Sequence, residues 1–326
     1  MPSQEQVAKN HWYRNDDIPG VAGPDREIRG YGPNPPKIRW ENDAKVAINI
    51  VINYEEGSEM TFAMGDGVND GMYELPFNVD EQRDLAKESM YEYGSRAGIW
   101  RLFRTFDRYD IPITVFGAAV ALERNPEVAK KIIERGDELV GHGYRWIDHY
   151  HYTREEERDL IEMAMDSFDK LGLKPEGWYC REMSTNTREL LVADGRFLYD
   201  SDYYGEDLPY WTFIDGKSHL VVPYSLVVND CRYIMGTGFA APSDFVEIAK
   251  RTVQQLLDDG DDCGRMMSIG LHPRITGNPA RTHGLAEFIA WAKEQEGVVF
   301  MRRNDIAKKF IEQVPRPETP EDRPNR

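Results

Sequence analysis

The sequence contains only three cysteines, Cys180, Cys231 and Cys263, and none of them belongs to a CxxC pair. This scarcity excludes a framework of disulfide bonds and a zinc site made of cysteines. No apolar run is long enough to cross a bilayer, and the polar residues after Met1 lack the apolar stretch of an export signal. We therefore expect a soluble protein of the cytoplasm with no membrane partner.

Positive charge is also scarce, since 40 Lys and Arg face 57 Asp and Glu and give a formal net charge of −17. This balance disfavours nucleic acids and anionic membrane surfaces as partners. It leaves neutral small molecules open as substrates. The hydrophobic content of 40% and the aromatic content of 11% are typical of a folded enzyme with a large core.

Strand-like and helix-like patterns alternate between two irregular ends. Residues 1–39, rich in proline, glycine and charge, predict an irregular extension packed on the domain, and residues 314–326 predict a disordered tail. The alternation over 40–313 predicts a single α/β domain with a mostly parallel sheet wrapped by helices. Strands are expected over 46–52, 111–117, 138–142, 177–181, 197–202, 220–224 and 267–272. Helices are expected over 98–109, 126–135, 154–171, 187–194, 242–257, 284–295 and 303–313.

Polar residues stand where the predicted strands end. In parallel α/β folds the chemistry gathers at this edge of the sheet, so we expect one active site in a barrel mouth. Two adjacent buried carboxylates repel each other, which should split their pKa values and leave one of them suited to act as a base. The residues at these ends are Glu55, Glu56, His142, Arg181, Asp202 and His272.

Five ordered motifs carry these residues, and together they resemble the polysaccharide deacetylase superfamily. The motifs cover 54–57, 142–146, 178–181, 199–202 and 268–272. The resemblance spans roughly 30–313 and implies the irregular (β/α) barrel of the NodB-like type. The details are most similar to the metal-independent allantoinase branch, with cyclic imide hydrolases as neighbours, and they imply a homo-oligomer, with a tetramer as one candidate. Segments 53–57, 91–98, 142–148, 199–202, 207–211 and 271–281 carry this closer match.

The metal motif departs from the superfamily. Typical members pair two adjacent aspartates with two histidines four residues apart, and they bind a metal through the second acid and both imidazoles. Here Trp146 stands four residues after His142 and offers no lone pair to a metal. The resemblance therefore implies that no cofactor is required, with zinc at Glu56 and His142 as the alternative. Three neighbours could act as substitute ligands, although a solvated loop explains their spacing better: Asp148, His149 and His151.

Hydrolytic opening of a cyclic amide needs a base for water, stabilisation of an oxyanion and an acid for the leaving nitrogen. The resemblance gives Glu55 the role of base and His272 the role of acid. Glu56 would orient the water or hold a cation, and His142 would position the water or the carbonyl group. Each of two residues also has a purely structural interpretation. Glu56 could form an ion pair with an arginine, and His272 could have a structural role alone.

The third and fourth motifs imply that Arg181 and Asp202 form a pair that orients the base. The allantoinase pattern expects a small residue, Gly and Arg after Trp178-Tyr179, whereas this chain has Cys180-Arg181-Glu182. This shift leaves the identity of the substrate open. Nothing around Cys180 supports a nucleophile, so we interpret it as a structural thiol.

Further substrate contacts are expected from side chains beside these motifs. Ser95 and Arg96 could grip a polar oxygen if they open a helix, although a plain helix start would need no function. Aromatic side chains could wall a planar pocket, although core packing explains many of them. The expected set is Glu56, His142, Tyr93, Ser95, Arg96, Trp146, Tyr179 and Trp211.

The favoured function is that of a hydrolase that opens a cyclic amide, allantoin to allantoate, as in purine catabolism. Three alternatives remain open. They are a cyclic imide hydrolase, a metal-dependent deacetylase of cell-wall or chitin-type glycans, and an inactive carbohydrate-binding barrel. The missing second histidine and the missing export signal disfavour the deacetylase, and the acids and imidazoles kept at the strand ends disfavour the inactive barrel.

Overall fold

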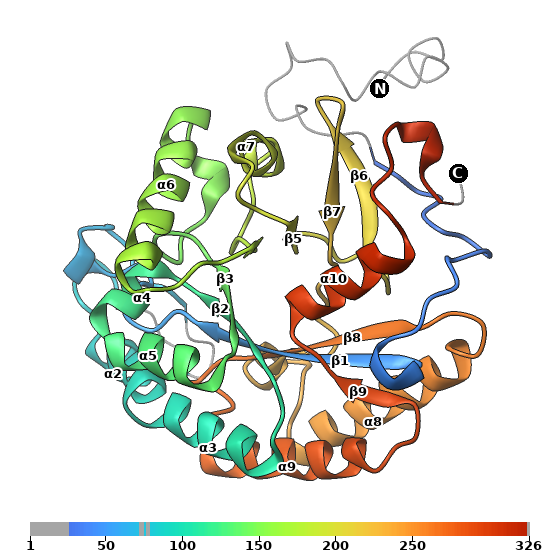
Figure 1. The fold of residues 1–326 in the computed structure, drawn as a ribbon. Coiled ribbons are helices and arrows are strands. Elements are labelled where there is room, and N and C mark those ends of the chain that lie inside the picture. Colours follow the sequence, from blue (N-terminus) through green and yellow to red (C-terminus); the bar gives the residue numbers. More distant parts are fainter. Residues whose placement is uncertain (1–25, 72–74, 76–78, 325–326) are drawn as a thin grey trace, which may run out of the picture.

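A curled, mostly parallel sheet forms the centre of the computed structural model, which describes residues 26–71, 75 and 79–324 (Figure 1). The strand order is β6-β7-β5-β4-β3-β2-β1-β8, and β9 pairs with the first half of β1. The sheet curls into a half-barrel, which confirms the predicted single-domain (β/α) barrel. The strands are β1 (Val46–Tyr54), β2 (Thr114–Gly117), β3 (Glu138–Gly141), β4 (Gly177–Trp178), β5 (Tyr199–Asp200), β6 (Tyr210–Ile214), β7 (Lys217–Val221), β8 (Arg265–Leu271) and β9 (Val298–Phe300).

Helices cover the convex side of the sheet in Figure 1, and α10 lies on the other side. The expected helices over 126–135, 187–194 and 303–313 coincide with α5, α7 and α10, and the others differ by a few residues at their ends. The helices are α2 (Leu85–Tyr93), α3 (Ile99–Tyr109), α4 (Ala119–Arg124), α5 (Pro126–Arg135), α6 (Arg154–Lys170), α7 (Thr187–Asp194), α8 (Pro242–Asp259), α9 (Pro279–Lys293) and α10 (Arg303–Gln313).

Strand β1 packs against apolar side chains on both faces of the sheet. All nine of its residues are buried, as expected for a parallel strand between two apolar layers. Ile48 and Ile50 pack in the layer beneath the helices, whereas Ala47 and Val51 belong to the inner cluster that also contains Phe310 of α10. Successive side chains of β1 point to opposite faces of the sheet, so alternate residues pack in two different hydrophobic cores.

Two short strands escaped the sequence analysis, β6 and β9. Asp215 and Gly216 both adopt positive φ angles, 49° and 75°, and form the tight turn that joins β6 to the antiparallel strand β7. The strand predicted over 220–224 is this β7, which begins earlier and ends at Val221.

The described parts of the two terminal segments run beside the edge of the barrel. The Tyr31 hydroxyl donates to the carbonyl oxygen of Pro209 at 2.7 Å, so the described part of the N-terminal extension packs on the domain. The first 25 residues of that extension lie outside the described residues. The predicted disordered tail is described as far as Pro324, and the Arg323 guanidinium lies 5.6 Å from the ring centre of Phe213. In the part of the chain that the structure describes, no helix is long and apolar enough to cross a membrane.

Candidate active site

Three strand ends bring a carboxylate and two imidazoles into contact. Glu55 follows β1, His142 follows β3 and His272 follows β8. Oε1 of Glu55 lies 3.2 Å from Nε2 of His142 and 3.5 Å from Nε2 of His272. All three side chains are buried. The predicted meeting of distant acids and imidazoles at one edge of the sheet is therefore present.

A buried arginine that the sequence analysis assigned no role, Arg274, holds both carboxylates of the first motif. Its Nη2 lies 2.7 Å from Oε2 of Glu55, and its Nη1 lies 3.6 Å from Oε1 of Glu56. Its backbone N–H also donates to Oε1 of Glu56 at 3.2 Å. Glu56 thus contacts an arginine, as its structural interpretation expects. The Oε2 atom of Glu56 also accepts the backbone N–H of Glu55 at 3.0 Å.

The two neighbouring carboxylates differ in acidity, as their adjacency predicts. Burial tends to raise the pKa of Glu55, but Arg274 and His272 outweigh burial and hold it well below its usual range. Burial raises the pKa of Glu56 to about 7, with Arg274 opposing and the charge of Glu55 adding to the rise. Glu55 is therefore ionised, whereas Glu56 exchanges its proton near neutrality.

His272 is held as a proton donor by Asp230, which lies in the 3₁₀ turn Asp230–Tyr233. Nδ1 of His272 lies 2.6 Å from Oδ1 of Asp230, and because a carboxylate only accepts, Nδ1 carries the hydrogen. The other oxygen of Asp230 accepts from the backbone of His272 and the hydroxyl of Thr276. Burial tends to lower the pKa of His272, but Cys231, Glu55 and Asp230 raise it well above its usual range. The imidazole is therefore protonated, with Nε2 directed at Glu55.

His142 is fixed by Tyr179. Its Nδ1 lies 2.7 Å from the carbonyl oxygen of Tyr179, so Nδ1 donates and Nε2 remains on the side of Glu55. The two rings stack with centroids 5.3 Å apart, and the Tyr179 hydroxyl hydrogen-bonds the hydroxyl of Tyr204. Tyr179, a predicted substrate contact, therefore packs against the ring of His142.

The predicted pair of Arg181 and Asp202 does not form. Arg181 binds Asp70 through two hydrogen bonds of 2.5 and 2.9 Å and contacts Asp148 at 3.0 Å. Asp202 instead accepts the backbone N–H of Cys180 at 2.9 Å. The acidic loops around Arg181 draw its side chain away from Asp202, and the guanidinium on the base belongs to Arg274.

Trp146 stands where typical family members have their second histidine, and it contacts two guanidinium groups. The Cζ atom of Arg181 lies 3.9 Å from the ring centre and that of Arg274 lies 5.1 Å from it. Trp146 is half-buried and lies beside Arg274, and its predicted contact with a substrate stays a prediction. Tyr91, which begins the matching segment 91–98 but was given no role in the site, is a further neighbour, with its ring centre 4.6 Å from the Cζ atom of Arg274.

Tyr93, Ser95 and Arg96 make contacts of their own instead of opening a helix. The helix already begins at Leu85, and a π-helical turn over Gly94–Gly98 joins α2 to α3, so Ser95 and Arg96 have no free helix start beside them. The Ser95 hydroxyl bonds that of Tyr54 at 2.8 Å, and the exposed Arg96 pairs with Glu92 at 3.4 Å. The Tyr93 hydroxyl accepts from Arg101 at 2.7 Å. The free helix start on which the expected grip of a substrate oxygen by Ser95 and Arg96 rested is therefore absent, and their contact with a substrate stays a prediction.

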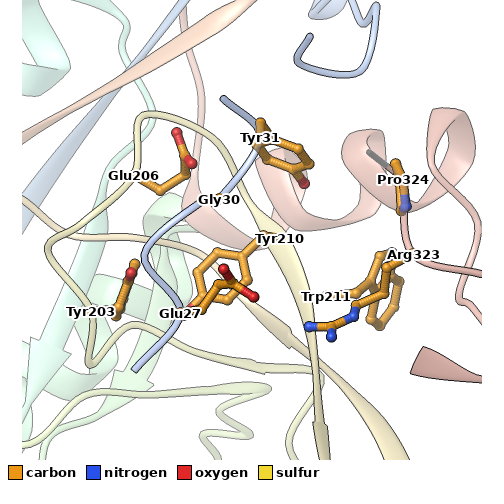
Figure 2. A pocket seen from close by; sticks show the side chains of 9 residues that line it. All are labelled: Glu27, Gly30, Tyr31, Tyr203, Glu206, Tyr210, Trp211, Arg323 and Pro324. Atoms are coloured by element: carbon orange, nitrogen blue, oxygen red, sulfur yellow. The ribbon is translucent and has the colours of Figure 1, made fainter. Parts of the chain in front are cut away.

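Trp211 lies in a different hollow, beside the C-terminal segment and close to Arg323 (Figure 2). Its indole N–H donates to the carbonyl oxygen of Val314 at 3.0 Å, which anchors the end of α10. Tyr31 and Tyr210 line the same hollow. These contacts give Trp211 a packing role apart from Glu55.

The side chains do not fit the two-histidine metal site of typical family members. Both oxygens of Glu56 accept backbone N–H groups, and Nε2 of His142 faces Glu55 instead. Among the described residues, two sets of three side chains bring potential ligand atoms within 4.8 Å of one another, and neither includes Glu56 or His142. The sets are Asp230, Cys231 and His272, and His149, Glu157 and Cys180.

Comparisons with known proteins agree with this fold. A model of the polysaccharide deacetylase family matches residues 87–193. A Schizosaccharomyces pombe protein whose assigned name is that of a polysaccharide deacetylase is 33% identical over 325 residues, covering 93% of this chain and 99% of that protein. The solved structure of a Pseudomonas aeruginosa PAO1 protein assigned to the polysaccharide deacetylases is 41% identical with a TM-score of 0.86, covering 90% of this chain and 99% of that chain. The crystal structure of a PuuE allantoinase is similar to the same extent, with 41% identity, a TM-score of 0.86, and 90% and 99% coverage.

The barrel and the proteins that it resembles are those of hydrolases that act on carbon–nitrogen bonds. The chain belongs to the polysaccharide deacetylase family.

Proposed function

We propose that the protein opens a cyclic amide ring by hydrolysis, with allantoin as substrate and allantoate as product. The contact between Glu55 and His272, with Oε1 and Nε2 3.5 Å apart, carries this proposal. Their pKa values are shifted in opposite directions, Glu55 down and His272 up, so the base is ionised and the acid is protonated at neutral pH. Similarity to an allantoinase over 90% of this chain supports the choice of substrate.

In the proposed reaction, water adds to the ring carbonyl carbon while Glu55 takes one of its protons. The carbonyl π electrons move onto oxygen and form a tetrahedral oxyanion. When these electrons return, the carbon–nitrogen bond breaks, and His272 gives its Nε2 proton to the departing nitrogen. The product is a ureido acid, and proton exchange with water restores both side chains. His142 positions the carboxylate of Glu55, since its Nε2 lies 3.2 Å from the same oxygen.

A substrate panel tests the proposal. Purified protein is assayed for ring opening of allantoin, hydantoin, dihydrouracil and succinimide side by side. We expect the highest kcat/KM with allantoin. A preference for succinimide would instead favour the cyclic imide hydrolase, and no ring opening at all would contradict the proposal.

The second candidate is a deacetylase, which the names given to the two deacetylase-like relatives favour, and the family resemblance implies that it would depend on a metal. It is tested in the same panel with an N-acetylated glucosamine oligomer in the presence of zinc. Zinc-dependent release of acetate without ring opening would favour this second function. The cytoplasmic location and the oligomeric state stay predictions from the sequence.

A further inference from the structure

The site contains buried polar atoms that no other described residue satisfies. Arg274 has no hydrogen-bond partner for Nε or Nη1, and Tyr91 has none for its hydroxyl group, among the described residues. The two side chains are neighbours, since the Cζ atom of Arg274 lies 4.6 Å from the Tyr91 ring centre. Buried polar atoms are nearly always paired in native proteins, with the protein, water or a ligand. Donors left open beside the ionised Glu55 are therefore available to a substrate.

The orientation of Arg274 is fixed on several sides. Nη2 is tied to Glu55 at 2.7 Å, and the Cζ atom lies 4.6 Å from the ring centre of Tyr91 and 5.1 Å from that of Trp146. The two rings are 6.4 Å apart and inclined by 54°. A planar guanidinium gains from contacts with aromatic rings, which restrict its motion more than they would restrict a lysine ammonium. The cation is thus pre-positioned before any substrate binds.

Arg274 contacts the positions that the family uses for its metal. By the resemblance described above, Glu56 and Trp146 correspond to two metal ligands of typical members, and both contact Arg274 here. We propose that Arg274 is a catalytic residue whose guanidinium binds the substrate carbonyl oxygen and stabilises the oxyanion, in place of a metal ion. The proposal rests on the proposed ring-opening function and extends it to a residue to which no role was assigned.

The chemistry of this role needs no further reactant. As water adds to the carbonyl carbon, negative charge collects on oxygen, and the N–H groups of Arg274 donate hydrogen bonds to it. The guanidinium keeps its protons throughout, and the charge leaves the oxygen when the carbon–nitrogen bond breaks. A donor directed at the oxyanion acts on the transition state more than on the bound substrate. Trp146 is a positioning residue that acts through Arg274, and the ring of Tyr91 positions the same guanidinium.

The variants R274A and R274K, with R251A as the control, test the inference in metal-free buffer. Arg251 lies on α8 with an exposed side chain and pairs only with Glu247 among the described partners. We expect R274A to lose about a thousandfold in kcat with a smaller change in KM, R274K to remain strongly impaired, and R251A to stay near wild type. Added methylguanidine should restore part of the R274A rate with saturation, whereas ethylammonium should restore less.

Loss of Arg274 removes the guanidinium that contacts both Glu55 and Glu56, so folding is checked by circular dichroism and thermal unfolding. W146A serves as a second variant that keeps the ion pairs of Arg274 and removes one ring. We expect W146A to lower kcat about tenfold and W146F to restore most of that loss. R274A within threefold of the wild-type rate would overturn the inference and leave the proposed function intact. If the wild type opens no ring but deacetylates an amide, and R274A loses that rate, the inference stands and the proposed function fails.

Discussion

Glu55 and His272 touch at 3.5 Å across the sheet, although the one follows β1 and the other follows β8. The contact exists because β1 and β8 are adjacent and parallel, with Ile52 opposite Leu271, so both strands end at the same edge. An ionised carboxylate beside a protonated imidazole is the starting state that hydrolysis of an amide requires.

The variants E55Q and H272A test the two catalytic roles. Each should lose about a thousandfold or more in kcat, because each removes one proton-transfer partner at a preorganised site. Steady-state assays with the preferred ring substrate measure the loss. E247Q, an exposed change on α8, is the matched control for charge loss and should leave the rate unchanged. A rate within tenfold of wild type in either site variant would remove that residue from the scheme.

The dependence of kcat/KM on pH follows from the same pair. Glu55 has a lowered pKa, so activity should fall only below its ordinary value of 4.5. His272 has a raised pKa, so activity should persist above its ordinary value of 6.5 and fall at higher pH. Substituting D230N removes the carboxylate on Nδ1, which should move the alkaline limb to lower pH. A profile in D230N that overlays the wild type would show that Asp230 does not set the acidity of His272.

Glu56 should make stability depend on pH in the neutral range. Its folded-state pKa is raised from 4.5 to about 7, so its contribution is fully present below pH 4.5 and is lost as the pH rises towards 7. A shift of this size corresponds to about 3 kcal/mol of unfolding free energy. The variant E56Q should flatten this dependence. Urea unfolding at pH 5 and pH 8 measures it, and an equal fall in both proteins would assign the effect to other groups.

The sequence predicted that the acid and the imidazoles lie together, because their positions follow from a simple rule about parallel strands. Glu55, His142 and His272 each stand directly after a buried apolar run, and the ends of such runs meet. The sequence did not predict a role for Arg274, because the direction of its side chain depends on the turn after β8. In that turn the His272 carbonyl oxygen accepts the N–H groups of Ile275 and Thr276. No periodic pattern in the sequence encodes that turn.

The wrong prediction that Arg181 pairs with Asp202 has a similar cause. Its partner Asp70 comes from an irregular segment rich in Gly and Asp, where neither helical nor strand periodicity predicts which side chain faces the barrel. Strand β9, with three half-buried residues, is too short to give a recognisable pattern. Asp215-Gly216 is a recognisable hairpin turn, so β6 could have been found from the sequence.

Removal of metal ions should leave the ring-opening rate unchanged. The carboxylate of Glu56 is taken up by two backbone N–H groups and by Arg274, so it has little capacity left for zinc. Protein dialysed against EDTA should keep its kcat/KM within about twofold of the value before dialysis, since dialysis removes no group that takes part in the proposed reaction. Elemental analysis of the dialysed protein is the control. A loss of activity that stoichiometric zinc restores would move the assignment to the metal-dependent deacetylase class.

The interior of the half-barrel depends on Arg303, the first residue of α10. Its fully buried side chain donates to Ser201 at 2.7 Å, Asn49 at 2.6 Å and Ser268 at 3.1 Å, and so ties three parts of the sheet together. Substituting R303M should lower the unfolding free energy by about 3 kcal/mol or more, because these acceptors lose a charged donor and stay buried. Urea unfolding compares R303M with R251M, an exposed change of the same type that should cost less than about 0.5 kcal/mol. Equal stability of the two variants would mean that the barrel interior repacks without the guanidinium and that α10 is held by its apolar face alone.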